Sequence, residues 1–124
     1  MPPLPTLRQS MIQQMLRLVE AFSTHVKDRS TLGELHQMVG NEGSWRNGHE
    51  LFDRIRRKSL AVDAADGLAI TQYNFEEACA KTLFNLTDTD APFDRDAAYW
   101  VVPHALRLAQ QLGMETEITR IVTA

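Results

Sequence analysis

The sequence contains one cysteine, Cys79, among its 124 residues. An internal disulfide is therefore excluded, which is typical of proteins from reducing compartments. The N-terminal residues show no basic stretch followed by an apolar one, so we expect no secretory signal. No apolar run approaches the about 20 residues needed to cross a bilayer. These absences predict a cytoplasmic protein without a membrane segment.

Signals for β-strands are also missing. No segment alternates between apolar and polar residues, and the Asn47-Gly48 and Asp66-Gly67 pairs flank helical patterns instead of joining two strands. The chain is 44% hydrophobic and 23% charged, which is ordinary for a globular domain of this length. We therefore predict a single all-α domain over residues 1–124, a compact, bundle-like arrangement of five to six helices.

Apolar residues recur at the spacing of one helix face in most of the chain. This spacing predicts helices over 7–26, 31–39, 48–62, 75–86 and 103–112. The clearest pattern is in 75–86, where the predicted buried residues are Phe75, Ala78, Cys79, Thr82, Leu83 and Leu86. Residues 114–124 fit either a helix or a strand, because Ile118, Ile121 and Val122 suit both.

The expected helix ends follow from capping residues. Four starts carry Thr or Asn with Glu or Gln three residues later, the capping-box spacing: Thr6–Gln9, Thr31–Glu34, Asn47–Glu50 and Asn74–Glu77. Pro103 suits the first position of a helix. Gly40 and Gly113 suit the left-handed position that ends one. We interpret Gly67 as the breaker after helix 48–62.

Aromatic residues are few, and three of them lie in 90–113 beside two valines. We expect one core that includes Phe75, Leu83, Phe93, Trp100 and Leu108. Trp45 should fold back onto it. Cys79 lies on the apolar face of helix 75–86, where a buried thiol behaves as an inert hydrophobic group, so we expect it to be neither catalytic nor disulfide-bonded.

Charge is divided unevenly along the chain. Residues 1–62 carry nine basic and six acidic side chains, whereas residues 63–124 carry four and ten. Four aspartates crowd one segment of the acidic half: Asp88, Asp90, Asp94 and Asp96. We expect them to contact a protein partner with a basic surface, although helix capping is an alternative. Calcium is not predicted, because the EF-hand pattern places Phe93 where glycine is required and Tyr99 where the closing glutamate belongs.

Two other functions remain open. Arg54, Arg56, Arg57 and Lys58 form a basic run on helix 48–62, which suggests a helix-turn-helix-like DNA-binding regulator. Two observations disfavour nucleic acid as a partner: the 40–46 connection is longer than the usual helix-turn-helix turn, and the chain is acidic. The basic run can instead pair with the acidic half of the chain.

A small enzyme around His104 is the other alternative. No paired histidines, phosphate loop or nucleophile motif supports it, so we assign no catalytic residues, metal or cofactor.

The segment Gln72-Tyr-Asn-Phe-Glu-Glu-Ala-Cys-Ala-Lys-Thr-Leu-Phe-Asn-Leu, with Pro92-Phe-Asp and Tyr99-Trp-Val-Val-Pro-His-Ala-Leu, resembles small uncharacterised bacterial proteins. Some of these are of the immunity-protein type, which bind and neutralise a toxin domain. The resemblance carries no catalytic motif. It implies a non-enzymatic protein-binding module, an immunity- or antitoxin-like protein.

Overall fold

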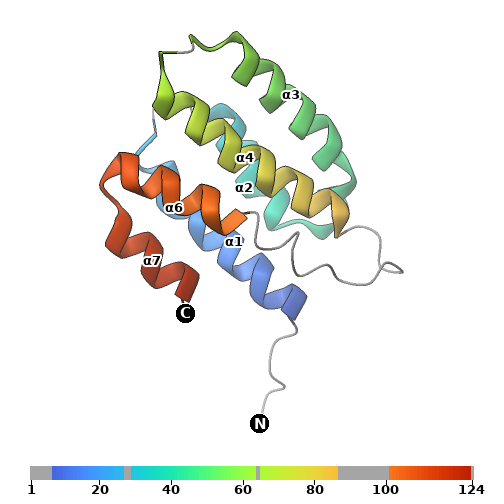
Figure 1. Cartoon of the computed structure of the whole chain (residues 1–124). Helices are drawn as coiled ribbons and strands as arrows, with labels where there is room; N and C mark the ends of the chain where they lie inside the picture. Colours follow the sequence, from blue (N-terminus) through green and yellow to red (C-terminus); the bar gives the residue numbers. More distant parts are fainter. Residues whose placement is uncertain (1–6, 27–28, 64, 87–100, 124) are drawn as a thin grey trace.

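The computed structural model describes residues 7–26, 29–63, 65–86 and 101–123 (Figure 1). All regular secondary structure in this part of the chain is helical, and it contains no strand, so the all-α prediction is confirmed. Its elements are α1 (Leu7–Ser23), α2 (Ser30–Val39), the 3₁₀ helix η1 (Glu42–Asn47), α3 (Gly48–Ala61), α4 (Gly67–Asn85), α6 (Val101–Leu112) and α7 (Glu115–Thr123).

The central element is α4, which lies between α3 and α6 (Figure 1). It also packs against α2 and η1. The α1 helix reaches it through Phe22, whose ring meets that of Phe75 edge to face with centroids 4.9 Å apart. The outer helix α7 packs on α6 and α1. Because α4 has neighbours on several sides, its buried positions run around much of its circumference, including the polar Thr71, Gln72 and Glu76.

The contact between α3 and α4 is closest at Gly48. A Cβ atom at this position would lie 2.8 Å from the carbonyl oxygen of Ala80 and 3.2 Å from the Cβ of Phe84. The distance of 2.8 Å is shorter than the contacts that real Cβ atoms make. The Ala80 oxygen belongs to the backbone, so a change of side-chain rotamer cannot move it away. Gly48 is therefore required for the close approach of the two helices.

The predicted start of α4 is wrong. The helix begins at Gly67 instead of residue 75, so Gly67 opens α4 and Asn74 lies inside it. Asp66 is the N-cap, and its Oδ1 accepts a hydrogen bond from the backbone N–H of Ala69 at 3.1 Å. The first two turns were missed because their buried face carries Thr71 and Gln72, which do not form an apolar stripe.

The capping boxes predicted at the starts of α2 and α3 do not form. Arg29 is the N-cap of α2 and Asn47 that of α3, and neither makes a side-chain cap hydrogen bond. Thr31 lies inside α2, and its expected box partner Glu34 instead pairs with Arg54 on α3.

Other boundaries differ by smaller amounts. The α1 helix ends at Ser23, before residue 26, and a turn closed by the His25 N–H and the Phe22 carbonyl follows it. The α6 helix starts at Val101, which places Pro103 within the first turn, where its missing N–H is still tolerated.

The glycine and tail predictions have mixed outcomes. Gly113 has a φ of 70°, as predicted, whereas Gly40 ends α2 in a right-handed conformation. Residues 114–124 fitted either a helix or a strand in the sequence, and the structure places the helix α7 there.

Most of the expected core is confirmed. All six predicted residues of helix 75–86 are buried, as is Leu108. Trp45 is buried as well, and its Nε1 donates a hydrogen bond to the Met38 carbonyl at 2.9 Å. This contact anchors η1 to the end of α2. Phe93 and Trp100 lie outside the described residues.

We predict that Gly48→Ala destabilises the protein by about 1–3 kcal/mol, because the added methyl group forces α3 away from α4. The matched control is Gly33→Ala on α2, where a Cβ meets no atom within 4 Å. That change should stabilise the protein by about 0.5–1 kcal/mol through the higher helix propensity of alanine. Urea unfolding measures both, and equal effects of the two substitutions would contradict the close-approach argument.

Candidate functional site

The sequence-predicted partner site lies outside the described residues. The site consists of four aspartates within the undescribed residues 87–100: Asp88, Asp90, Asp94 and Asp96. Their contact with a partner stays a prediction. The aspartates in the described acidic half include two with local roles. Asp66 caps α4, and the Oδ1 of Asp63 accepts a hydrogen bond from the Ala65 N–H at 3.0 Å.

The basic run on α3 is divided among different neighbours. The Nη1 of Arg54 lies 2.8 Å from the Oε1 of Glu34, and the Nζ of Lys58 lies 2.7 Å from the Oγ of Ser30, so both side chains reach α2. Arg56 faces α4 instead, where its charge acts on Glu77. Burial raises the pKa of the Glu77 carboxyl above its usual value, and the Arg56 guanidinium opposes that rise.

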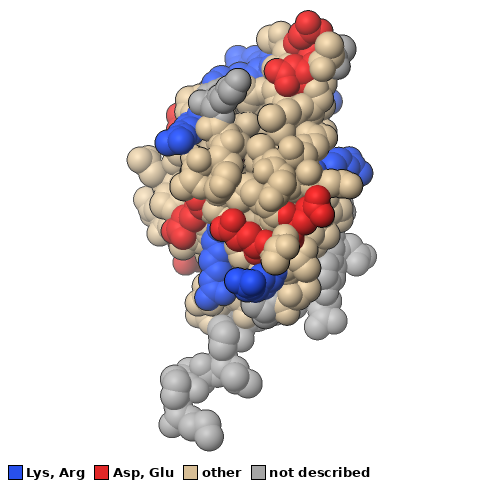
Figure 2. Space-filling model, turned by 90° about the vertical axis from the view of Figure 1, so that its left-hand side faces the viewer, with Lys and Arg blue, Asp and Glu red and all other residues tan. Residues whose placement is uncertain are grey.

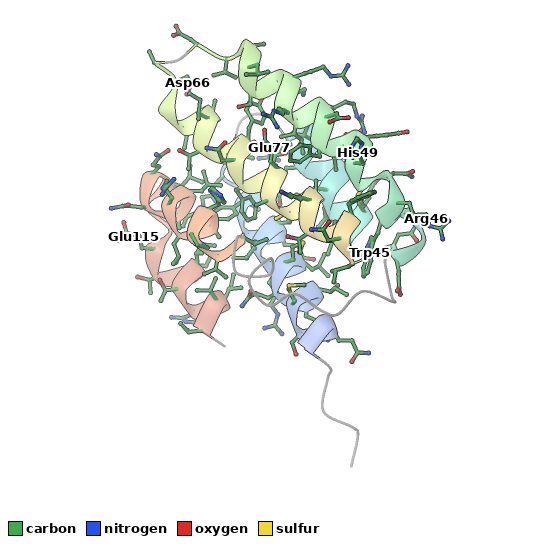
Figure 3. All side chains as sticks on the ribbon, turned by 45° about the vertical axis from the view of Figure 1, so that its right-hand side comes forward. Trp45, Arg46, His49, Asp66, Glu77 and Glu115 are labelled. Carbon is green, nitrogen blue, oxygen red and sulfur yellow. The ribbon has the colours of Figure 1, made fainter. Side chains whose placement is uncertain are left out.

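Figure 3 shows Glu77 and His49 on the α3–α4 pair. Glu77 lies on α4 beside α3, and His49 lies farther along α3, toward Trp45 and Arg46. The expected pairing of the basic run with the acidic half therefore applies to Arg56, whereas Arg54 pairs within the first half of the chain.

The order of charges on α3 disfavours DNA recognition. A recognition helix of the helix-turn-helix type places its N-terminal residues against base edges. The corresponding part of α3 buries Gly48 and Leu51 and exposes Glu50 and Asp53. Carboxylates at this end would repel phosphate, and the arginines come only in the later turns. The connection from α2 also contains the whole of η1 and is longer than a three- or four-residue turn.

Three of the four histidines contact neighbouring polar groups at the surface. His25 Nδ1 lies 2.7 Å from Thr24 Oγ1. His36 Nε2 lies 3.2 Å from Glu20 Oε1, which joins α2 to α1. His49 Nδ1 lies 3.4 Å from Asp53 Oδ2, and its ring lies 5.6 Å from that of Phe84. The described residues contain no group of three or more His, Cys, Asp or Glu side chains that could hold a metal ion.

His104 differs from the other histidines in its buried ring nitrogen. Nδ1 of its ring has no hydrogen-bond partner among the described residues. Burial lowers the pKa of His104, and the nearby positive charge of Arg107 lowers it further. This shift favours the neutral form of the ring. No described contact orients it in the way that a second polar group orients a catalytic base.

The most unusual polar group of the core is Glu76, whose burial was not predicted from the sequence. Its side chain is 0% exposed, and its Oε2 accepts a hydrogen bond from the Nε2 of Gln72 at 3.1 Å. The i, i+4 spacing of these two residues was the available signal.

Cys79 lies one turn further along α4 and is also 0% exposed. Burial raises the pKa of its thiol well above the usual value, and the charge of Glu76 acts in the same direction. The thiol is therefore protonated and enclosed, in agreement with the expected inert role.

Comparison of the chain with protein-family models, curated proteins and solved structures finds no match. Within the described residues, no helix combines the length and the apolar character needed to span a membrane.

The shifted pKa of His104 predicts a pH dependence of stability. Because the pKa is lower in the folded state, the unfolded state takes up this proton first as the pH falls below about 6.5, the usual value for histidine. Stability is then lost progressively until the pH passes the folded-state pKa. We expect His104→Gln to remove this contribution, so its melting temperature should fall less than that of the parent between pH 7 and pH 5. Identical losses in the two proteins would show that His104 titrates as in the unfolded chain.

Proposed function

We propose that this protein is a non-enzymatic protein-binding module of the immunity or antitoxin type, whose acidic half binds the basic surface of a toxin domain. The observation that carries the proposal is the division between interior and surface. The core contains two side chains of a type that can act as an acid, base or nucleophile, Glu76 and Cys79. Both are fully buried. A substrate cannot reach either group in this conformation. A binding partner would therefore recognise the protein by the charge and shape of its surface.

The charge distribution supports a basic partner. The second half of the chain carries ten acidic and four basic side chains, and four of the acids crowd 88–96. On the described surface of this half, Glu115 and Glu117 are exposed on α7. Figure 2 views the side of the molecule that α6 and α7 occupy, where acidic groups form a short band beside basic ones. Such a field accelerates encounter with a partner of opposite charge.

The experiment uses the tagged full chain to capture proteins from its own host, followed by expression of any captured basic protein. The proposal requires that this protein stops growth when expressed alone and that co-expression of the chain restores growth. Asp88→Asn/Asp90→Asn should slow association about tenfold at low salt and leave the melting temperature unchanged, because charges at the rim of an interface act mainly on the association rate.

The control is Glu115→Gln/Glu117→Gln, which removes the same charge from the same half of the chain. It should leave association nearly unchanged. Equal slowing by both pairs would indicate a general charge effect without a site at 88–96. A captured partner that is acidic, or one whose activity the chain does not suppress, would contradict the proposed function.

A further inference from the structure

One face of α3 is left uncovered by the helices that pack against it. Leu51 and Ile55 point into the core, and Arg54 and Lys58 reach toward α2. Figure 1 shows α3 at the edge of the helix array, with α4 on its inner side. The solvent side of α3 exposes four side chains, which we name the α3 seam: His49, Asp53, Arg56 and Leu60. His49 and Arg56 lie at the border of this seam with α4, where they interact with Phe84 and Glu77.

The α3 seam has the spacing of a coiled-coil contact. Its members follow one another at intervals of four, three and four residues, which is the a/d repeat of a heptad. Leu60 is 79% exposed, the highest value among the large hydrophobic residues of the described chain. Burial of this side chain against a partner would remove apolar surface from water.

The seam is complementary to itself in one orientation. When two α3 helices run antiparallel about a two-fold axis between Asp53 and Arg56, Asp53 of each copy faces Arg56 of the other. His49 then faces Leu60 of the second copy. A parallel arrangement would place Asp53 against Asp53 and Arg56 against Arg56, so the order of charges selects the antiparallel one.

The residues beside the seam favour the same orientation. Glu50 and Arg57 are exposed and lie on one flank of the seam, seven residues apart. In the antiparallel arrangement the acidic flank of one helix lies along the basic flank of the other. Acidic groups in the first half of α3 and basic groups in the second half therefore match across the two-fold axis.

We propose that the protein self-associates through an antiparallel contact of two α3 helices centred on the α3 seam. This contact uses residues of α3 and does not depend on the proposed toxin-binding function. A helix of 14 residues is about 21 Å long. The area that it can bury is well below the about 800 Å² per partner of a standard interface. The dimer is therefore weak and reversible, and it dissociates at high salt.

The test is sedimentation of the full chain from micromolar to millimolar concentration at low salt. We expect a monomer–dimer equilibrium that Leu60→Ser, Asp53→Arg and Arg56→Asp each weaken about tenfold or more. The double variant Asp53→Arg/Arg56→Asp restores opposite charges across the axis and should regain dimerisation. The control is Leu106→Ser, which removes a partly exposed leucine from α6 and should have no effect.

A chain that stays monomeric at every concentration overturns the proposal, as does a dimer that the seam substitutions leave unchanged. A double variant as monomeric as the single ones overturns the antiparallel pairing. If a charge reversal lowers the melting temperature, Asp53→Asn and Arg56→Gln test the same contact with smaller changes. Binding of a duplex oligonucleotide by a monomeric chain, lost in Arg56→Asp, would assign this face to nucleic acid instead.

Discussion

The burial of α4 on several sides is the constraint on which the other helices depend. This helix supplies contacts to α3, α6, α2 and η1, and through Phe75 it meets α1. A helix enclosed in this way cannot rely on one apolar stripe, and it carries buried polar side chains at Thr71, Gln72, Glu76 and Thr82. Their hydrogen bonds within the helix reduce the cost of removing them from water. The outer helices then need only one apolar face each.

The arrangement of α3 follows from its closest contact with α4. At Gly48 the two backbones approach so closely that a methyl group does not fit. This fixes the N-terminal end of α3, and Arg54 and Lys58 hold its later turns to α2. With these sides occupied, Leu60 and Asp53 are exposed to solvent, and His49 and Arg56 lie at the border of the α3 seam with α4. The self-association that we propose is thus a consequence of how α4 positions α3, whereas the proposed toxin contact depends on the aspartates of 88–96.

Helix periodicity predicted the fold class because most helices here bury one apolar face. It failed at the start of α4, where buried Thr71 and Gln72 replace apolar residues. The capping-box pattern marked the start of α2 and α3 within a residue but misassigned the glutamates. Glu34 pairs with Arg54 on another helix, a contact that no local pattern contains. The burial of Glu76 was missed for a related reason, because the faces of a central helix are decided by helices distant in sequence.

The central claim is that α4 is the most enclosed and most stable element of the protein. Native-state hydrogen exchange tests it most directly, because amides in such an element exchange only when the whole domain unfolds. The account predicts that the slowest-exchanging amides are those of Thr71–Leu83, with opening free energies equal to the global free energy of unfolding, and that α7 exchanges faster through local opening. Exchange of α4 as fast as that of α7 would contradict the account.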